Sequence, residues 1–378
     1  MTTHLDKAVL DTGSVAVVFG TRPEIIKLAG IIDLLGDGAR TIFSGQHFDD
    51  LMSRTVFVDL QLPPPSVMLA IGGQSRARQI GELVQRLEEE LSERRPAVVV
   101  VQGDTNTALA GALAANALEI PLVHVEAGLR SFDRRMPEEH NRVVTDHLAD
   151  LCLAPTDQAR ENLRAERIPD ERIALTGNTV VDVASRLMPA PEERANLLTK
   201  LGLKAGGFIL ATFHRPENVD DVDRFGTLIG HLTCLGLPVF FPVHPRTRNH
   251  MQVRGLDQRA NGVAMVPPVG YRTFLGLAAE CAFLLSDSGG VQEEASVVKR
   301  PVIVVRRSTE RPEVLGTFAT LVPSLVDLPT VAHQILAGLA DTHRRLAGVP
   351  SPYGDGQASV RCVHHITVAL RGWSRRVR

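Results

Sequence analysis

The sequence is poor in the features that mark several classes of protein. Its 378 residues include four cysteines, and no two of them form a CxxC pair. The longest apolar runs have the length of a strand, well short of the roughly 20 residues of a membrane-spanning helix. A formal net charge of −2 gives no general attraction to nucleic acid or to a membrane surface. These absences argue against a disulfide framework, a cysteine-based zinc site, a membrane protein and a nucleic-acid-binding protein.

Two further absences concern location and cofactors. Residues 1–13 are polar and contain two aspartates, so the pattern predicts no signal peptide. The cysteines are scattered, and three of the four lie in apolar segments, which is typical of reduced, buried thiols. We therefore expect a cytoplasmic protein. No GxGxxG sequence follows the first strand of either half of the chain, which argues against a dinucleotide cofactor.

Short apolar segments alternate with helical patterns along the chain. Strands that are apolar on both faces belong to parallel sheets covered by helices, so the pattern predicts an α/β protein with two Rossmann-like halves. A polar segment with proline, residues 189–193, separates the halves and places a domain boundary after residue 188. The predicted strands are residues 14–19, 39–43, 98–101, 122–125, 151–154 and 173–176, and then 208–213, 238–242, 263–266, 281–285, 301–305 and 320–322.

Carboxylates follow two successive strands of the first half. Asp104 closes one buried strand, Glu126 closes the next, and Glu138 lies in the loop beyond. In parallel sheets, ligands collect at the carboxyl ends of the strands. We expect these acids to converge there beside Arg130, in a site that handles protons next to an anionic substrate.

The first strand of the chain ends in GTRPE, residues 20–24, and a helix is predicted over residues 25–35. Backbone N–H groups at the start of this helix, together with Arg22 and Lys27, favour an anion. The same residues also fit a plain strand-to-helix turn with solvated charges. This motif alone does not decide between the two interpretations.

The second half repeats the layout with different side chains. His214 and His244 end successive strands there, among charged neighbours. Ser288, Gly289 and Gly290 follow another buried strand and open a helix. A hydroxyl, two glycines and a helix N-terminus in this order can cradle a phosphate.

Other side chains of the second half are candidate contacts for a nucleotide. Glu294 either interacts with the helix dipole or accepts the two hydroxyls of a ribose, and we favour the ribose. Phe274 can stack on a base, although a lone phenylalanine is more often part of a core. One arginine is expected to face the phosphates, and the candidates are Arg306, Arg307 and Arg311.

Together these residues resemble the non-hydrolysing UDP-N-acetylglucosamine 2-epimerase family. Eight motifs occur in the order typical of that family and span nearly the whole chain, which makes the resemblance specific. They are GTRPE with Lys27, GDT at Asp104, HVEAGLR at Glu126, PEE at Glu138, HR-x-EN at His214, SDSGG-x-QEEA at Ser288, TERPE at Arg311 and PYGDG-x-A at Tyr353.

The resemblance implies a GT-B-like architecture, in which two Rossmann-like domains hold the nucleotide in the cleft between them. It also implies a last helix, from about residue 357 to 378, that returns to the first domain. The domains are then residues 1–188 with this helix and residues 189–356. The implied reaction is the reversible inversion at C2 that converts UDP-GlcNAc to UDP-ManNAc, through elimination of UDP and its re-addition to a 2-acetamidoglucal. Members need no NAD and no metal, and they form homodimers.

The resemblance also implies roles for individual residues. No carbonyl activates the hydrogen at C2, so departing UDP must leave positive charge at C1, and a cluster of acids is expected around the sugar. The implied catalytic residues are Asp104, Glu126, Glu138 and His214. The implied substrate-binding residues are Arg22, Ser288, Gly289, Gly290 and Arg311 at the diphosphate, Glu294 at the ribose and Phe274 at the uracil, with Lys27, Arg130 and His244 also in the site.

Other functions share parts of this pattern. The form SFDRRMPEE, residues 131–139, looks like that of archaeal members and of relatives that act on diacetamido sugars, so a 2-epimerase of a UDP-diacetamido sugar is one alternative. A hydrolysing epimerase that releases UDP and ManNAc is another, and we expect no appended kinase-like domain of the kind that would favour it. The acid cluster argues against a GT-B glycosyltransferase and against a non-catalytic UDP-sugar-binding protein.

Many bacterial members bind a second UDP-GlcNAc as an activator, through residues that follow a Gln-His pair and through an Arg-Gln pair. Here Gln46 and His47 are followed by FDD, residues 48–50, and Gly73 precedes Gln74. We therefore expect this activator site to be weakened or absent.

Overall fold

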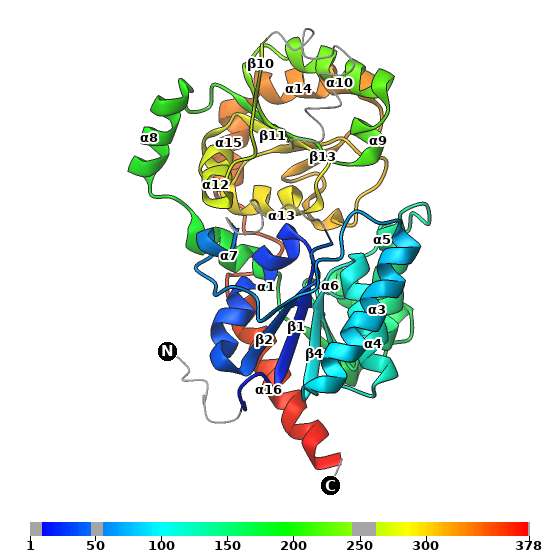
Figure 1. Ribbon diagram of the computed structural model, residues 1–378. Helices are drawn as coiled ribbons and strands as arrows, with labels where there is room; N and C mark the ends of the chain where they lie inside the picture. The colour runs from blue at the N-terminus through cyan, green and yellow to red at the C-terminus, as the bar shows by residue number, and fades with distance from the viewer. Residues whose placement is uncertain (1–9, 47–55, 244–261, 377–378) are drawn as a thin grey trace. The chain divides into compact units, whose positions relative to one another are not determined.

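The computed structural model describes residues 10–46, 56–243 and 262–376, and the chain divides into two compact units. The first unit comprises Met1–Val183 and Tyr353–Arg378, and the second comprises Ala184–Pro352 (Figure 1). The domain boundaries expected after residues 188 and 356 stay predictions. Within the described residues, no helix is both long enough and apolar enough to span a membrane.

A seven-stranded parallel sheet, in the order β3-β2-β1-β4-β5-β6-β7, forms the centre of the first unit. Every residue of β1 and β4 is buried, as expected for strands covered on both faces. The six strands predicted for this half are confirmed, whereas the two-residue edge strand β3 is too short to give a pattern. The strands are β1 (Val15–Phe19), β2 (Ala39–Phe43), β3 (Val67–Met68), β4 (Val98–Gln102), β5 (Leu122–Val125), β6 (Leu151–Ala154) and β7 (Ile173–Leu175).

The first helix of this unit begins at Arg22, three residues before the predicted start at residue 25. The helix that follows β5 begins at Pro137, so the prediction that Glu138 lies in a loop is wrong. Proline favours the first turn of a helix, and Glu138 therefore belongs to that turn. The helices are α1 (Arg22–Leu35), α3 (Arg76–Glu93), α4 (Asn106–Ala117), α5 (Pro137–Leu148), α6 (Asp157–Ala165), α7 (Thr179–Leu187, which ends in the second unit) and α16 (Ala358–Arg376), with 3₁₀ turns at Gly36–Gly38 and Asp170–Arg172.

The C-terminal helix α16 packs against α1 within the first unit. Their approach is close, since a Cβ atom on Gly30 of α1 would lie 2.3 Å from the hydroxyl oxygen of Ser359. Asp182 accepts hydrogen bonds from the backbone N–H groups of Ala358 at 3.1 Å and of Ser359 at 2.6 Å. Its carboxylate thus satisfies N–H groups that have no partner inside the helix, and it complements the positive N-terminus of α16.

The second unit has a six-stranded parallel sheet in the order β10-β9-β8-β11-β12-β13. All six strands predicted for this half are confirmed. They are β8 (Ile209–Thr212), β9 (Val239–Pro242), β10 (Val263–Val266), β11 (Phe283–Ser286), β12 (Val302–Val304) and β13 (Ala319–Leu321). The helices are α8 (Pro191–Leu201), α9 (Pro216–Val219), α10 (Val222–Thr233), α12 (Tyr271–Glu280), α13 (Gly289–Val298), α14 (Leu328–Ala337) and α15 (Leu339–Ala347), with 3₁₀ turns at Pro312–Val314 and Leu325–Asp327.

The strand order reverses direction once in each sheet. In the first sheet β1 lies between β2 and β4, and in the second β8 lies between β9 and β11. The change of direction falls between β1 and β4 in the first sheet and between β8 and β11 in the second. The loops that leave the two strands of such a pair run to opposite sides of the sheet, which leaves room for a ligand at the carboxyl ends of the strands. These loops begin at Gly20 and Gly103 in the first sheet, and at Phe213 and Asp287 in the second.

We expect Asp182→Ala to lower the free energy of unfolding by about 1–2 kcal/mol, because α16 loses its N-terminal acceptor. Urea unfolding followed by circular dichroism measures this change. Asp341→Ala is the control, because Asp341 is an exposed aspartate on α15 that forms an ion pair with the exposed Arg344. Equal effects of the two substitutions would contradict a capping role for Asp182.

Candidate active site

Glu126 lies directly beyond β5, at the carboxyl edge of the first sheet. Its backbone is left-handed, with φ at +67°, which is uncommon for a residue other than glycine. The residue is 9% exposed. Lys27 Nζ donates to Glu126 Oε2 at 2.5 Å, and Asn178 Nδ2 donates to the same oxygen at 3.0 Å. Backbone strain and two donors fix this carboxylate in one place, which is characteristic of functional sites.

Asp104 follows the adjacent strand, β4, which pairs with β5 in parallel. Arg142 on α5 forms an ion pair with the Asp104 carboxylate and also lies 3.3 Å from Glu139 Oε2. Asn141 Nδ2 donates to the backbone oxygen of Asp104 at 2.9 Å. The Asp104 side chain is 31% exposed, so it stays accessible to a ligand while α5 holds it in position.

The neighbouring acids Glu138 and Glu139 face different surroundings. Glu139 is buried and accepts hydrogen bonds from the N–H of Ser131 at 2.9 Å, its hydroxyl at 2.8 Å and the N–H of Phe132 at 2.9 Å. It therefore holds the loop that precedes α5. Glu138 is half-buried in the first turn of α5, so it is the one of the two that can reach a ligand.

The two arginines predicted to bind substrate in this unit differ in their surroundings. Arg22 begins α1 and is half-buried. Arg130 is 3% exposed, and its guanidinium contacts Glu166 at 2.7 and 2.5 Å, Asp146 at 2.7 Å and the carbonyl of Leu129 at 2.7 Å. Although burial opposes its charge, these acids raise the pKa of Arg130 above its ordinary value. The geometry argues for a structural role and against the predicted contact of Arg130 with substrate.

Glu24 is a site residue that the sequence analysis did not single out. It is 2% exposed and accepts hydrogen bonds from the N–H of Gly20 at 3.0 Å and from the hydroxyls of Thr21 and Thr105, each at 2.8 Å. These donors come from the loops after β1 and β4, so Glu24 joins the two loops that flank the change in strand order. Burial raises the pKa of its carboxyl to about 7, although the hydrogen bonds favour the ionised form. The Thr-x-x-Glu spacing of a capping box was the available signal.

His214 in the second unit lies beside a buried aspartate. Asp287, directly after β11, is fully buried and accepts hydrogen bonds from the backbone N–H groups of His214 and Arg215 and from Asn218 Nδ2. His214 Nδ1 lies 3.1 Å from Asp287 Oδ1, and the His214 side chain is 58% exposed. Burial opposes ionisation of Asp287, but His214, Asn218 and Arg215 lower its pKa. Asp287 thus orients the imidazole and leaves Nε2 as the nitrogen available to a ligand.

The predicted phosphate cradle lies at the N-terminus of α13. Ser288 is the N-cap residue, and Gly289 and Gly290 begin the helix. A Cβ atom on Gly289 would lie 2.6 Å from Glu310 Oε1 and 3.8 Å from a terminal nitrogen of Arg311, which places that guanidinium beside the cradle. Arg311 is buried and paired with Glu293. The start of α13 therefore combines a helix N-terminus with a fixed cation, and the Glu310 carboxylate lies closer to Gly289 than that cation does.

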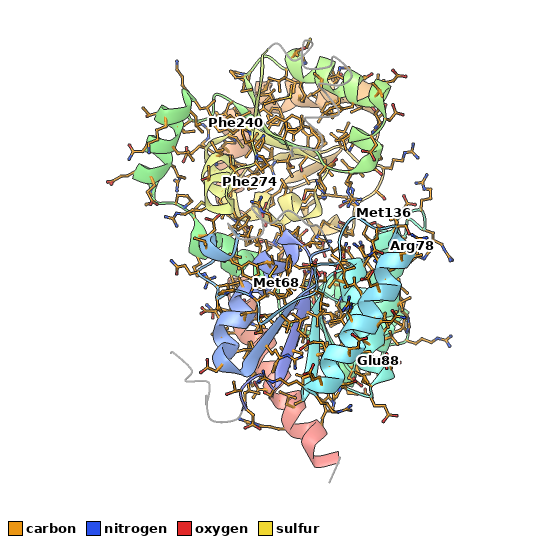
Figure 2. All side chains as sticks on the ribbon, in the orientation of Figure 1. Met68, Arg78, Glu88, Met136, Phe240 and Phe274 are labelled. Carbon is orange, nitrogen blue, oxygen red and sulfur yellow. The ribbon has the colours of Figure 1, made fainter. Side chains whose placement is uncertain are left out.

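The remaining predicted contacts are less well defined by the structure. Glu294 is 7% exposed in the first turns of α13, and Phe274 on α12 is 8% exposed (Figure 2). Such burial leaves little of the Phe274 ring available for stacking. His244 lies outside the described residues, as does His47. Contacts of these residues with ribose, uracil or activator stay predictions.

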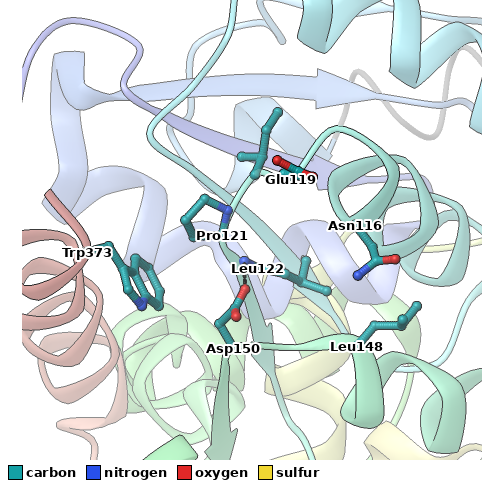
Figure 3. Close-up of a pocket in the computed structure, with 8 residues that line it drawn as sticks. Asn116, Glu119, Pro121, Leu122, Leu148, Asp150 and Trp373 are labelled. Carbon is teal, nitrogen blue, oxygen red and sulfur yellow. Dashed lines mark hydrogen bonds between the residues drawn. The ribbon is translucent and has the colours of Figure 1, made fainter. Parts of the chain in front are cut away.

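Two further observations concern metal ions and a cavity in the described part of the chain. No group of three or more His, Cys, Asp or Glu side chains there is arranged to hold a metal ion. A cavity of the first unit opens where β5 begins, at the sheet edge opposite to Glu126, and Trp373 and Asp150 line it (Figure 3). The cavity is therefore separate from the acids at the strand ends.

The first sheet brings Lys27 together with Glu126, and Asp104 together with Arg142, at its carboxyl edge. The second brings His214, Asp287 and the start of α13 together at its own carboxyl edge. A parallel sheet with acids at its carboxyl edge, and a second parallel sheet with the predicted phosphate cradle at its own carboxyl edge, give the class of the chain, which is a GT-B-like α/β protein.

Comparison with known proteins narrows this class. The model of the UDP-N-acetylglucosamine 2-epimerase family matches residues 38–367. The UDP-N-acetylglucosamine 2-epimerase of Methanocaldococcus jannaschii is 36% identical over 364 residues, which cover 93% of this chain and 98% of that protein. Its crystal structure in complex with UDP-GlcNAc and UDP has a TM-score of 0.84 and covers 94% of this chain and 99% of that chain.

A relative with a different substrate is equally similar in sequence. The UDP-2,3-diacetamido-2,3-dideoxy-D-glucuronate 2-epimerase of Pseudomonas aeruginosa is 36% identical over 362 residues, which cover 93% of this chain and 99% of that protein. The chain belongs to the UDP-N-acetylglucosamine 2-epimerase family. The family and the fold class predicted from the motifs are both confirmed.

We expect Glu24→Gln to change how stability depends on pH. The Glu24 carboxyl titrates near 7 when folded and near about 4.3 when unfolded. The folded state therefore holds this proton more tightly, and the associated stability is lost as pH rises through 7. From pH 5 to pH 8 the unsubstituted protein should therefore lose about 2–3 kcal/mol of unfolding free energy that Glu24→Gln does not lose.

Urea unfolding at the two pH values measures this difference. The control is Glu88→Gln, which changes an exposed glutamate on α3 (Figure 2). If Glu24→Gln and the unsubstituted protein showed parallel pH profiles, Glu24 would not carry the raised pKa.

Proposed function

We propose that the chain catalyses the reversible epimerisation of UDP-GlcNAc at C2, which gives UDP-ManNAc. The observation that supports this function best is the pair of carboxylates at the ends of adjacent strands, Glu126 held by Lys27 and Asp104 held by Arg142. Membership of the family supports the substrate, because its M. jannaschii member was crystallised with UDP-GlcNAc and UDP.

In the proposed reaction, a carboxylate accepts the C2 proton while the bond between C1 and the UDP oxygen breaks. The electron pair of the C–H bond forms the C1=C2 double bond of a 2-acetamidoglucal, and UDP leaves with the bonding electrons of the C–O bond. UDP then adds back to C1 while an acid gives a proton to the opposite face of C2. One group cannot serve both faces, so the proposal requires acids at more than one position, for which we propose Asp104, Glu126 and Glu138.

The cations beside these acids have a supporting role in the proposal. Lys27 and Arg142 hold Glu126 and Asp104 in fixed orientations, so the carboxylates need not reorganise as positive charge develops at C1. Glu138 stays half-buried in the first turn of α5, where it can contact the sugar. In this proposal Lys27 and Arg142 orient two acids, and the third acid, Glu138, contacts the sugar.

The nucleotide contacts are also part of the proposal. The helix N-terminus at α13 and the Arg311 guanidinium beside it suit a diphosphate. His214, oriented by Asp287, can donate a proton or a hydrogen bond to the leaving UDP. The full set proposed to bind the nucleotide is Arg22, His244, Phe274, Ser288, Gly289, Gly290, Glu294 and Arg311. The proposed elimination and re-addition transfer protons and no hydride, so they give NAD no role, and the family resemblance implies no metal.

We further propose a homodimer, as the family resemblance implies, and a cytoplasmic location, as the cysteine pattern predicts, without strong activation by a second UDP-GlcNAc. Gln46, next to the predicted activator residues, already accepts hydrogen bonds at 2.9 Å from the N–H and from the hydroxyl of Thr107. Residues 47–50 lie outside the described residues.

Epimerisation of a UDP-diacetamido sugar is the second candidate. The 36% identity to the P. aeruginosa enzyme supports it, and the SFDRRMPEE form resembles that of relatives acting on diacetamido sugars as well as that of archaeal members. That substrate carries an acetamido group at C3 and a carboxylate at C6, so it needs additional polar partners in the sugar site.

Proton NMR of the purified protein with UDP-GlcNAc in deuterated water tests the proposal. Formation of UDP-ManNAc with deuterium at C2 and little free UDP is the expected result. Free ManNAc with an equal amount of UDP would instead show a hydrolysing enzyme. If the C2 proton persists and the diacetamido glucuronate substrate exchanges under the same conditions, the second candidate replaces the first.

We expect the variants Asp104→Asn, Glu126→Gln and Glu138→Gln each to lower kcat by about 10²- to 10⁴-fold, because each removes a group able to move a proton. Initial rates from either sugar nucleotide measure kcat and KM. Glu161→Gln, on the exposed surface of α6, is the control and should keep full activity. A variant with unchanged kcat would remove its residue from the proposed catalytic set.

A further inference from the structure

A buried chain of charged side chains lies behind the loops that carry Asp104 and Glu126. It begins at His124 on β5, which is 0% exposed, and continues to Asp146 on α5, also 0% exposed. Asp146 contacts Arg130, which contacts Glu166 near the surface. The reaction proposed above uses none of these side chains directly.

Both ring nitrogens of His124 face groups that accept hydrogen bonds. Nε2 lies 2.8 Å from the backbone oxygen of Gly103, and Nδ1 lies 2.6 Å from Asp146 Oδ1. A carbonyl oxygen has no hydrogen to donate, so Nε2 must carry a proton. Asp146 Oδ2 accepts from the N–H of Gly128 at 3.1 Å and pairs with the Arg130 guanidinium at 2.7 Å, and this cation favours the ionised carboxylate, which has no proton on Oδ1. Nδ1 must then donate as well, and a neutral imidazole has only one N–H group.

The charges around His124 agree with this protonation. Burial opposes ionisation of Asp146, but His124 and Arg130 lower the pKa of its carboxyl below the ordinary value. Cys152 on β6 donates its thiol to the Asp146 backbone oxygen at 3.5 Å, and burial raises the pKa of that thiol, so it adds no charge. An imidazolium and a guanidinium thus flank one buried carboxylate, and Glu166 balances the second cation. Buried charges are tolerated only when they are paired and hydrogen-bonded in this way.

The contacts of this pair fall on the two loops of the candidate site. Gly103, which His124 binds, directly precedes Asp104, and Gly128, which Asp146 binds, lies two residues after Glu126. Both glycines have left-handed backbones, with φ of +72° and +83°. A Cβ atom on Gly128 would lie 2.2 Å from the carbonyl oxygen of Ala159, so this loop has little freedom to shift.

We propose that His124 is held as an imidazolium whose two N–H groups bind the Asp104 loop to Asp146, and that it is the positioning residue that sets Asp104 relative to Glu126. The positioning role rests on the proposed function, whereas the imidazolium does not. His124 itself lies beneath the strand ends and moves no proton in the reaction. Its function is to keep two carboxylates at the separation that the sugar requires.

The first test examines the unsubstituted protein without substrate. Nitrogen-15 NMR of histidine-labelled protein at pH 8 should show protons on both ring nitrogens of His124. His124→Gln, or Asp146→Asn if the first variant does not fold, identifies the signal by its loss. A His124 ring with a single protonated nitrogen would overturn the proposal.

The second test measures positioning. We expect His124→Gln to lower kcat by about tenfold to 100-fold, with KM changed by less than about threefold, because the substrate contacts themselves remain. The control His364→Gln changes an exposed histidine on α16 and should keep both constants. A lower thermal midpoint with unchanged kcat would show that His124 only stabilises the fold, and this result would overturn the positioning role.

The two tests separate this inference from the function it rests on. If the unsubstituted protein shows no epimerisation of either UDP sugar, the proposed function fails, and the positioning role fails with it. The nitrogen spectrum still decides whether His124 is an imidazolium. If the protein epimerises normally but the ring is neutral, only the inference about His124 fails.

Discussion

Parallel pairing of the two central strands in each sheet is the constraint on which both candidate sites depend. Pairing of β1 with β4 in the first sheet places Gly20 so close to its neighbours that a Cβ atom would lie 2.1 Å from the Ser44 hydroxyl and 2.2 Å from the Thr107 hydroxyl. In the second sheet, β8 pairs with β11 and the hydroxyls of Thr212 and Ser286 are 2.7 Å apart. Strand pairing aligns the ends of the strands, and it thereby sets the positions of the polar groups that follow them.

Charge pairing holds the acids of the site in position at the sheet edges. Lys27 faces Glu126, Arg142 faces Asp104, and Arg311 faces Glu293. Each cation offsets a charge whose burial would otherwise be costly, and each fixes the direction in which the carboxylate points. The carboxylates are therefore oriented before a ligand arrives, and removal of a cation takes away the charge that holds its acid in place.

The sequence predicted the strands and their order of alternation well, because uniformly apolar segments between polar turns have few other interpretations. It also placed Asp104, Glu126 and His214 at strand ends. It could not show which charges pair, because Lys27 and Glu126 are 99 residues apart in the chain. Arg130 looks like a ligand-binding arginine in the sequence, and only its contacts with Asp146 and Glu166 reveal a structural role. The sequence did not identify Glu24, Asp287 and His124 for the same reason, because their contacts are with residues on other elements.

The order in which the chain is made gives the cap on α16 a further meaning. The segment Ala184–Pro352 is continuous, so the second unit has all its residues before the ribosome reaches Tyr353. The first unit, although begun earlier, needs the residues that follow Pro352 before α16 covers α1 and the Asp182 carboxylate finds its N–H partners. Domains generally fold as units during synthesis, the N-terminal one first. In this chain the unit that is started first is completed last, so a prematurely ended polypeptide would carry a finished second unit and an open first one.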